Sequence, residues 1–501
     1  IGSNDSTIDI ESPEIIGGAF ALYGYSFNFY DGVLRGGTHS YQEGTINTIA
    51  DNSTITQEIQ TIGGTEYETR YLVAEHNVAR IGDTYYLRLA DAISDAEDND
   101  IIELIDDNYF FSNITIPAEK TISIKTNGQK IFPNAQIINN GSLSIANNST
   151  TANPQIDYYG SGYFIVNNAD AELSLQNLIL SCHSGVSNSG TANLRGISID
   201  ATSTTINNSG SLTANNANLA SSQYALYNNG GEASFSTISL TGKTLYVNAG
   251  TLNLSDGTLS KTGASVKDFI TNKGTLNLNQ ITATLTNTDL ELPNGDNQLT
   301  QTLYNTGNLT ASNNSHIRYV LDMPGKTVWE YVLAVYNDAG TMTVANSTIE
   351  VDGNNVGRNS SKHTYGVYNP SGTLVIETGA IRTNSRGNSY GIWNGTGTTT
   401  IGIAEPPTSP NYGYDTADVS TTSPEITAIG TNAGEGVHNV SGKVYFYDGK
   451  VSGNTASFTT NPTGTEHFYE ICTELDASVT PNLYTSRLFW MRDGQSTCAN
   501  N

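Results

Sequence analysis

Apolar and polar residues alternate in short runs along most of this chain. After a series of glycines, apolar residues occupy every second position, as at Leu252 and Leu254 and again at Leu374 and Ile376. A two-residue period is that of a β-strand with one buried face, because successive side chains of a strand point to opposite sides. Helical spacing is absent from these runs, so the pattern predicts short strands.

The alternating runs belong to a recurring phrase. It consists of an aliphatic residue, a variable residue, Asn, one to three small residues, Gly, and then alternating polar and aliphatic residues. Two clear copies are VYNPSGTLVI at 367–376 and IWNGTGTTTI at 392–401. The glycines of the phrase lie at positions 141, 210, 231, 250, 274, 307, 340, 372, 397 and 442. Their gaps, mostly between 19 and 33 residues, fall in the period range of solenoid repeats.

Short strands, Asn/Gly turns and insertions of variable length predict an all-β fold. We expect a right-handed parallel β-helix, a β-solenoid, in which each coil stacks about 4.8 Å above the last and buries its neighbour's apolar face. The asparagines of the phrase should form a ladder at one corner, where Asn tolerates left-handed backbone and its amide can bond the next coil's amide. The predicted ladder consists of Asn228, Asn248, Asn272, Asn305, Asn337, Asn369, Asn394 and Asn439.

The hydrophobic pattern of residues 79–105 differs from that of the coils. Leu87, Ala90 and Ile93 fall at helical spacing, with Ala96 as a further candidate, and the strand IIELI follows. An amphipathic helix here is expected to cap the open edge of the first coil, since an exposed edge invites aggregation. The acidic residues of this stretch lack the Asp/Asn loop with Gly that calcium sites use, so we expect a solvated face.

The two ends of the chain resemble each other. FNFYDGVLRG at 27–36 matches VYFYDGKVSG at 444–453, and YETRYLVA at 67–74 matches YTSRLFWM at 484–491, both with a shift of 417 residues. The sequence SPEI precedes FNFYDGVLRG, at 12–15, and also precedes VYFYDGKVSG, at 423–426. Ile1 is therefore taken as the start of a processed or excised chain, and a tandem array or a filament of packed copies is expected. The predicted segments are 1–78, the last coil and closing hairpin of a preceding copy; 79–135, the N-terminal cap with helix and first coils; 136–455, the β-helix; and 456–501, the C-terminal closing hairpin.

The charge of the chain argues against several partners. Asp and Glu number 48 against 22 Lys and Arg, a formal charge of −26, and the basic residues do not cluster. Nucleic acid is therefore not expected as a partner, because phosphate binding needs clustered Lys and Arg. No apolar run approaches the roughly 20 residues of a spanning helix, so we expect no membrane insertion in this segment.

The three cysteines show no metal-ligand spacing, so no metal site is predicted. Cys472 and Cys498 are candidates for a disulfide near the C-terminal end of the sequence. Cys182 is expected to be a small buried hydrophobe.

These residues resemble a family, the pectin-lyase-like β-helix repeat proteins of bacterial cell surfaces. IGDTYYLRLADAISDAEDNDIIELIDD at 81–107 is similar to their N-terminal capping segment, and VYNPSGTLVI and VYFYDGKVSG are similar to their coils. The resemblance covers most of the chain. It implies the fold given above and a secreted adhesin, stalk or surface-layer protein, although enzymes share the fold.

The enzymes of this family cut acidic polysaccharides, and their motifs are incomplete here. The hydrolases share Asn-Thr-Asp, an Asp pair, Gly-His-Gly and Arg-Ile-Lys on successive coils, because the reaction needs two carboxylates at a fixed separation. The chain has Asn287-Thr288-Asp289 and Asp106-Asp107, in the wrong order, and lacks the other two motifs. A charge of −26 would also repel an anionic polymer. We predict no catalytic residues, no cofactor and no enzyme activity.

The position before each ladder asparagine should point outward. The predicted outward column reads Tyr227, Val247, Thr271, Tyr304, Tyr336, Tyr368, Trp393 and His438, and its predicted ligand-binding stripe is Tyr304, Tyr336, Tyr368 and Trp393. Such a stripe could stack neutral sugars or a neighbouring rod. The alternative is that stacked rings only stabilise parallel coils.

The sequence therefore favours an extracellular structural or adhesive protein of the cell surface or cell wall. Its β-helix would serve as a stalk or as a binding surface for a glycan, a cell-surface protein or copies of itself. Two alternatives stay open. One is a carbohydrate-active enzyme on the same fold, a polysaccharide lyase or a glycoside hydrolase; the other is a self-assembling filament or sheath subunit.

Overall fold

The fold is taken from a computed structural model that describes most of the chain. The residues outside the description are 1, 4–7, 11–13, 18–19, 25, 30–31, 43–44, 49–53, 63–64, 74–76, 111–112, 134, 151–154, 265–267, 290–298, 329–330, 360–362, 403–412, 415–422, 461, 463–468 and 491–501. Two compact units, Ile1–Thr202 and Ser203–Asn501, are each considered by themselves. The four predicted segments remain predictions.

The first ten strands form three small sheets. Their orders are β1-β4-β7, β2-β5-β8 and β3-β6-β10-β9. All pairs are parallel except those of β10, which runs antiparallel to both β6 and β9. The chain thus visits three strand positions in turn, as stacked coils do, and then forms an antiparallel hairpin. The bounds are β1 (Gly2–Ser3), β2 (Ile8–Ile10), β3 (Glu14–Gly17), β4 (Phe20–Gly24), β5 (Ser26–Phe29), β6 (Gly32–Gly36), β7 (His39–Gln42), β8 (Thr45–Thr48), β9 (Thr54–Ile62) and β10 (Thr65–Val73).

The rest of the first unit holds helix α1 and parallel coils. After the antiparallel strands β11 and β12, the strands β13, β16, β19, β21 and β23 follow one another in parallel register, as do β15, β18, β20 and β22. The bounds are β11 (Ala79–Ile81), β12 (Thr84–Tyr86), α1 (Leu89–Asp95), β13 (Asp100–Leu104), β14 (Asn108–Phe110), β15 (Ile114–Ile116), β16 (Thr121–Lys125), β17 (Ile131–Pro133), β18 (Ile137–Asn139), β19 (Ser142–Ala146), β20 (Gln155–Asn167), β21 (Glu172–Gln176), β22 (Ile179–Asn188) and β23 (Thr191–Asn208).

Helix α1 lies where the sequence predicts a helix, but its buried face differs from the prediction. Leu89, Ala92 and Ile93 are buried, whereas Leu87 precedes the helix and is 40% exposed. The predicted spacing assumed a helix that began before Leu87, but residues 84–86 pair with β11 as strand β12. The role of α1 as a cap remains a prediction.

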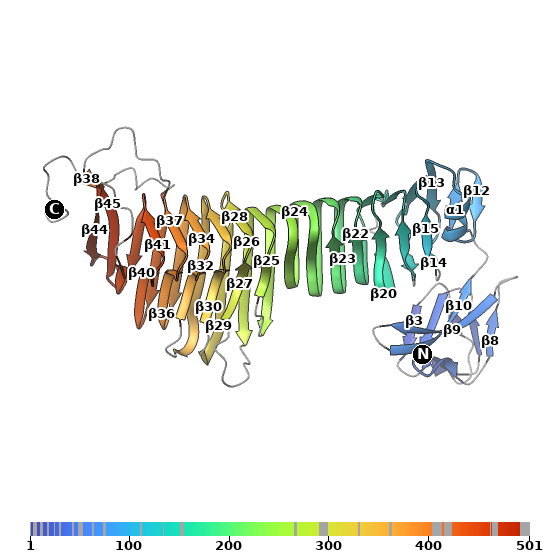
Figure 1. The fold of residues 1–501 in the computed structure, drawn as a ribbon. Helices are drawn as coiled ribbons and strands as arrows, with labels where there is room; N and C mark the ends of the chain where they lie inside the picture. The colour runs from blue at the N-terminus through green and yellow to red at the C-terminus, as the bar shows by residue number, and fades with distance from the viewer. Residues whose placement is uncertain are drawn as a thin grey trace. The chain divides into compact units, whose positions relative to one another are not determined.

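The second unit shows the repeat most clearly. Three columns of parallel strands follow one another coil by coil: β27-β30-β33-β36-β40, β28-β31-β34-β37-β41 and β29-β32-β35-β39-β42. Figure 1 shows these strands stacked side by side within the unit. The bounds are β24 (Ser211–Ala264), β25 (Asp268–Asn272), β26 (Thr275–Asp289), β27 (Leu299–Asn305), β28 (Asn308–Ser312), β29 (His316–Val328), β30 (Tyr331–Asn337), β31 (Thr341–Val344), β32 (Ser347–Asn359), β33 (His363–Asn369), β34 (Thr373–Ile376), β35 (Gly379–Ser385), β36 (Asn388–Asn394), β37 (Thr398–Ile401), β38 (Gly413–Tyr414), β39 (Glu425–Gly430), β40 (Ala433–Asn439), β41 (Lys443–Phe446), β42 (Lys450–Gly453), β43 (Ala456–Phe458), β44 (Tyr469–Asp476) and β45 (Leu483–Trp490).

The last strands repeat the topology of the first ten. Strand β39 pairs in parallel with β42, β42 pairs antiparallel with β45, and β45 pairs with β44 as a hairpin. In the same way β3 pairs with β6, β6 with β10, and β10 with β9. The parallel pairs agree in register, because Glu14 faces Val33 and Glu425 faces Lys450. The antiparallel pairs differ by one residue, because Val33 faces Tyr71 whereas Lys450 faces Arg487, the counterpart of Arg70. The sequence similarity of the two ends therefore has a counterpart in their strand pairing.

The core confirms the alternation read from the sequence. Leu276, Leu278, Leu374 and Ile376 are fully buried, and the residues between them are more exposed. Strands β11 to β45 belong to a mainly parallel sheet of 35 strands. The fold is thus all-β with the strand arrangement of a β-solenoid; its handedness remains a prediction. In the described ranges, no helix has the length and apolar character that crossing a membrane would need.

Candidate functional site

A column of asparagine amides runs along the coils of the second unit. In each step the Nδ2 of one side chain donates to the Oδ1 of the next over 2.7 to 2.9 Å, in the order Asn272, Asn305, Asn337, Asn369, Asn394 and Asn439. Asn208 donates to Asn228 in the same way. A third run, which begins in a looser copy of the phrase in the first unit, consists of Asn139, Asn167 and Asn188.

Each amide of the column also ties two turns of backbone together. Asn337 Nδ2 lies within hydrogen-bond distance of its own turn's Gly340 carbonyl, at 3.1 Å, and of the next coil's Thr373 carbonyl, at 3.2 Å. A Cβ on Gly372 would come within 2.4 Å of Asn337 Nδ2. The Asn and the Gly of the repeated phrase therefore depend on each other, because the Asn side-chain amide occupies the space that a Cβ on the glycine would fill.

Asn248 does not belong to this column, which corrects the prediction. In the register of β24 against β25, Val247 faces Asn272, and Val247 is fully buried. Asn248 instead donates to Asn229 Oδ1 at the surface. The physical reason is the phase of the strand: Leu245 points inward, so Tyr246 points outward and Val247 inward. Val247 is consequently not an outward residue either; Tyr246 takes its place.

The outward position before the ladder carries a column of rings. Tyr304, Tyr336, Tyr368, Trp393 and His438 face one another in register on β27, β30, β33, β36 and β40. Ring centroids are 5.2 Å apart for Tyr304–Tyr336 and Tyr336–Tyr368, both edge to face, and 4.4 Å for the stacked pair Tyr368–Trp393. All five side chains are partly exposed. The predicted stripe is thus a contiguous row of rings.

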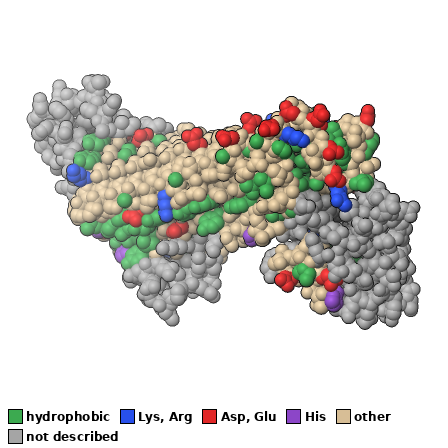
Figure 2. Space-filling view, turned by 45° about the vertical axis from the view of Figure 1, so that its right-hand side comes forward, with side chains coloured by type: hydrophobic (Ala, Val, Ile, Leu, Met, Phe, Trp, Pro, Cys, Tyr) green, Lys and Arg blue, Asp and Glu red, His purple; other side chains and the backbone are tan. Residues whose placement is uncertain are grey.

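A second column of rings, which sequence reasoning missed, lies beside the first. It consists of Tyr331 and His363, whose rings stack, and of Tyr365 and Tyr390, which face each other in register two residues further along their strands. The Tyr365 ring is 5.1 Å from that of Tyr368, and the Tyr390 ring is 5.3 Å from that of His438, so the two columns touch. We call these nine residues, of which Tyr365 is buried and the other eight are partly exposed, the aromatic face. Figure 2 shows side chains of the class that includes Tyr and Trp gathered in a band over the coils of the second unit.

Glycines bring the two columns together. Tyr365 and Tyr368 are three residues apart, so strict alternation would put them on opposite sides of the strand. Gly366 and Val367 are both buried, however, and the strand changes phase between them. A Cβ on Gly366 would come within 2.5 Å of the Ile381 side chain, and one on Gly391 within 2.5 Å of the Gly436 carbonyl. Only glycine fits at this bend.

The aromatic face contains no Lys or Arg and has acidic groups beside it. Tyr304 Oη donates to Asp338 Oδ2 at 3.0 Å, and His438 Nδ1 lies 2.6 Å from Glu435 Oε2. Burial, and then the Asp338 carboxylate, raise the pKa of Tyr304 to about 12. Burial likewise raises the pKa of Tyr336, Tyr365, Tyr368 and Tyr390. The phenols therefore stay protonated at neutral pH and can donate hydrogen bonds, but they do not act as bases.

A column of charged side chains lies on another strand position. Arg318 faces Glu350, and Glu350 faces Arg382, on β29, β32 and β35. Glu350 Oε2 is 2.8 Å from His316 Nε2 and 3.6 Å from Arg318 Nε. Opposite charges on neighbouring rungs stabilise a sheet, and we assign no chemistry to them.

Asn287 of the hydrolase-like motif and two of the three cysteines, Cys182 and Cys472, lie buried. Asn287 is buried and donates to Tyr319 Oη, so it is part of the core. Cys182 is a buried free thiol whose pKa burial raises to about 12. Cys472 is buried and disulfide-bonded. Cys498 lies outside the described residues, so its pairing with Cys472 stays a prediction. In the described ranges, no three His, Cys, Asp or Glu side chains gather where they could hold a metal ion.

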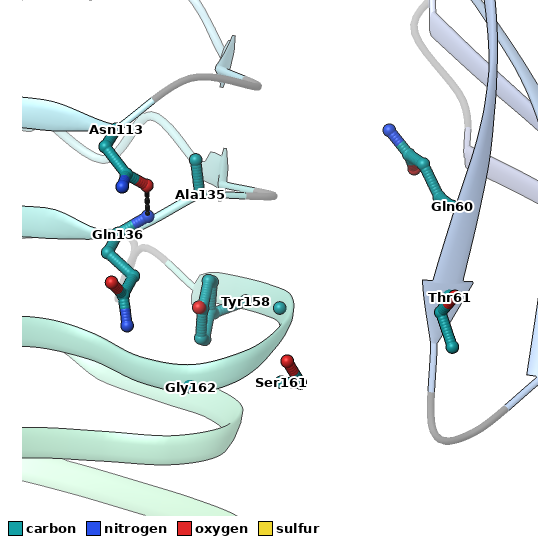
Figure 3. Close-up of a pocket in the computed structure, with 9 residues that line it drawn as sticks. Gln60, Thr61, Asn113, Ala135, Gln136, Tyr158, Ser161 and Gly162 are labelled. Atoms are coloured by element: carbon teal, nitrogen blue, oxygen red, sulfur yellow. Dashed lines mark hydrogen bonds between the residues drawn. The ribbon is translucent and has the colours of Figure 1, made fainter.

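A polar hollow in the first unit offers no acid–base pair. It is lined by Gln60, Thr61, Asn113, Ala135, Gln136, Tyr158, Gly160, Ser161 and Gly162 (Figure 3). Asn113 Oδ1 accepts a hydrogen bond from the Gln136 amide at 3.0 Å. Tyr158 is the titratable residue of this lining, and burial raises its pKa. The aromatic face is therefore the stronger candidate for a functional site.

Comparison of the chain with protein-family models, with curated proteins and with solved structures finds no match.

Proposed function

We propose that this chain is an extracellular structural and adhesive protein of the cell surface, in which the coils are a rigid support and the aromatic face is the contact surface. The observation that carries the proposal is that eight partly exposed rings, joined by the buried ring of Tyr365, lie in two touching columns on neighbouring coils. A partly exposed aromatic side chain offers apolar carbon atoms beside a polar group, and aromatic residues are enriched where proteins bind partners.

Two further features favour a role of the coils as a rigid support. The amide column links each coil of β27 to β40 to the next through buried hydrogen bonds, and buried polar networks with every donor paired make a structure rigid. The resemblance to the pectin-lyase-like β-helix repeat proteins of bacterial surfaces implies the same class of function. It also implies a right-handed solenoid and a capping role for α1.

Replacing Tyr336, Tyr368 and Trp393 together by Ser tests the proposal. The labelled full chain and this variant are applied to a glycan array and to whole cells, and the variant is expected to lose binding. Tyr445→Ser is the matched control, because Tyr445 stacks on Tyr447 at 6.0 Å outside the aromatic face.

Binding that persists in the triple variant, together with a lower melting temperature, would mean that the rings only stabilise the coils. Ordered filaments of the purified protein in electron micrographs, without binding to cells or glycans, would favour the self-assembly alternative.

A further inference from the structure

We propose that the Tyr and Trp rings of the aromatic face form a relay for one-electron oxidation, which carries an electron vacancy from ring to ring along the coils to Tyr304. The rings of these two types on the face are Tyr304, Tyr331, Tyr336, Tyr365, Tyr368, Tyr390 and Trp393. Such a relay depends on contacts among the rings and not on a ligand. It would therefore operate whether or not the aromatic face binds a partner.

The first column supplies a series of rings in contact. Tyr304, Tyr336 and Tyr368 follow one another with ring centroids 5.2 Å apart, and Trp393 stacks on Tyr368 at 4.4 Å. These separations are those of aromatic rings in direct contact. Phenol and indole rings give up an electron more readily than benzene or imidazole rings, and electron transfer is fastest between groups that touch. The turning of the rings toward one another along the coils is therefore what a relay requires.

The second column supplies a branch that joins this series. The buried ring of Tyr365 lies 5.1 Å from that of Tyr368 and 5.2 Å from that of Tyr390, and the Tyr331 ring lies 6.3 Å from it. Tyr365 thus links partly exposed rings through the interior of the strand. The two branches converge on Tyr368, so a vacancy that arises on either one reaches the same ring.

Tyr304 ends the relay because a base stands ready for its proton. Its Oη donates to Asp338 Oδ2 at 3.0 Å, a distance at which side chains can exchange a proton. Burial, and then the Asp338 carboxylate, raise the pKa of Tyr304 to about 12, so the phenol is protonated at neutral pH. When Tyr304 loses an electron, its O–H bond breaks, the proton moves to Asp338, and a neutral phenoxyl radical remains. Loss of the proton stabilises the radical, and the vacancy therefore stays on Tyr304.

The electron is accepted by a one-electron oxidant of the class of organic peroxyl radicals, which meets a partly exposed ring. The peroxyl radical takes one electron from that ring and one proton from water and becomes a hydroperoxide. The vacancy passes along the rings to Tyr304, whose proton goes to Asp338, and Asp338 then returns a proton to the hydroxide left in the solvent. Atoms and electrons balance, and the damage that the oxidant causes is confined to one phenol.

A photo-oxidant attached near His438, at the opposite end of the first column from Tyr304, tests the relay. Val440 is 56% exposed, so Val440→Cys can carry a thiol-reactive ruthenium complex, whereas the free thiol of Cys182 is buried. A laser flash with a soluble quencher oxidises the ruthenium in the labelled full chain. Transient absorbance and electron paramagnetic resonance should then detect a long-lived phenoxyl radical, and Tyr304→Phe should abolish that signal.

Substitutions by Phe separate electron transfer from packing, because they keep a ring but remove the readily oxidised one. Tyr336→Phe interrupts the series before Tyr304 and should cause loss of the long-lived signal although Tyr304 is present. Trp393→Phe should retain the signal, because the branch through Tyr390 remains. Tyr445→Phe is the control outside the aromatic face and should also retain it.

Asp338→Asn tests the end of the relay. The amide still accepts a hydrogen bond but is a much weaker base, so the phenoxyl radical should be lost or short-lived. A full signal in Tyr304→Phe, Tyr336→Phe or Asp338→Asn, in a variant whose thermal unfolding shows it to be folded, would overturn the inference. So would the lack of a long-lived phenoxyl signal in the labelled chain, or a signal that disappears in Tyr445→Phe.

Discussion

At the scale of single residues, the ladder shows how one shifted asparagine changes a network. Asn272 Oδ1 is buried and has no hydrogen-bond partner, because the preceding rung offers Val247 where the other rungs offer an amide. Asn228, one coil earlier, donates to backbone carbonyls such as that of Gly231, at 2.9 Å. An unpaired buried acceptor costs about 1 to 3 kcal/mol.

Restoring the missing amide should therefore stabilise the protein. Val247→Asn is expected to raise the free energy of unfolding by about 1 kcal/mol, since pairing Asn272 Oδ1 and gaining new hydrogen bonds outweigh the lost burial of one valine, about 1.5 kcal/mol. Chemical denaturation measures the change. Val367→Asn is the matched control: Val367 is equally buried but points into the apolar core, and the substitution should be destabilising. A loss of stability of equal size in both variants would contradict this account of the rung.

The sequence held the signal that separates Asn248 from the other asparagines. In the VYNPSG and IWNGTG copies the aromatic residue directly precedes Asn, whereas TLYVNAG has Tyr246, then Val247, then Asn248. When the copies are aligned on Asn, Val247 falls at the outward position. When they are aligned on the alternation that begins at Leu245, Val247 falls at the ladder position and Asn248 lies one residue beyond it. The strand period, not the identity of the residue, decides which side chain points inward.

At the scale of elements, the second aromatic column shows why the alternation of side chains alone does not predict every residue of the aromatic face. Tyr365 and Tyr390 stand three residues before Tyr368 and Trp393, an odd separation that predicts opposite faces. The bend at Gly366 and Gly391 reverses that expectation. YGVYN and YGIWN share the glycine in the same place, so the signal was present but could be interpreted only once the bend was seen. The strand columns themselves could be predicted, because apolar alternation repeats on every coil.

The protonated phenols of these strands predict a dependence of stability on alkaline pH. Folding raises the pKa of Tyr304 to about 12, against about 10 in an unfolded chain. A group whose pKa is raised by folding stabilises the protein fully below its unfolded pKa and loses that contribution as pH rises through the folded pKa. Stability should thus fall between about pH 10 and pH 12. Chemical denaturation at a series of pH values, with phenolate absorbance followed in parallel, measures it.

Tyr304→Phe should make that fall shallower, because one of the titrating phenols is removed. A fall in stability that is complete before phenolate absorbance appears would show that other groups cause it.

At the scale of the whole molecule, charge is the dominant property. A formal charge of −26 with few basic residues means that the folded chain repels itself. The ion pairs that the coils do form, such as Arg382–Glu425 at 3.2 Å, involve partly exposed side chains and contribute little. This property could be read directly from composition, unlike the bend in the strands.

Salt should therefore stabilise this protein. Raising sodium chloride from low to about physiological ionic strength and beyond screens charges separated by more than about 8 to 10 Å, and the melting temperature should rise by a few degrees. Potassium chloride at equal ionic strength is the control and should act alike, since screening depends on ionic strength and not on the ion. A melting temperature that falls with salt would show that favourable ion pairs outweigh repulsion.

The equal spacing of three rungs has an evolutionary consequence. Asn305, Asn337 and Asn369 are each separated by 32 residues, and Tyr304, Tyr336 and Tyr368 keep the same interval. A duplication or deletion of one such 32-residue block would present to its neighbours the same amide, ring and glycine that were there before. Descendants of this gene can thus change length in whole blocks, with the contact surface growing or shrinking in step, while an insertion of any other size must be accommodated in a loop.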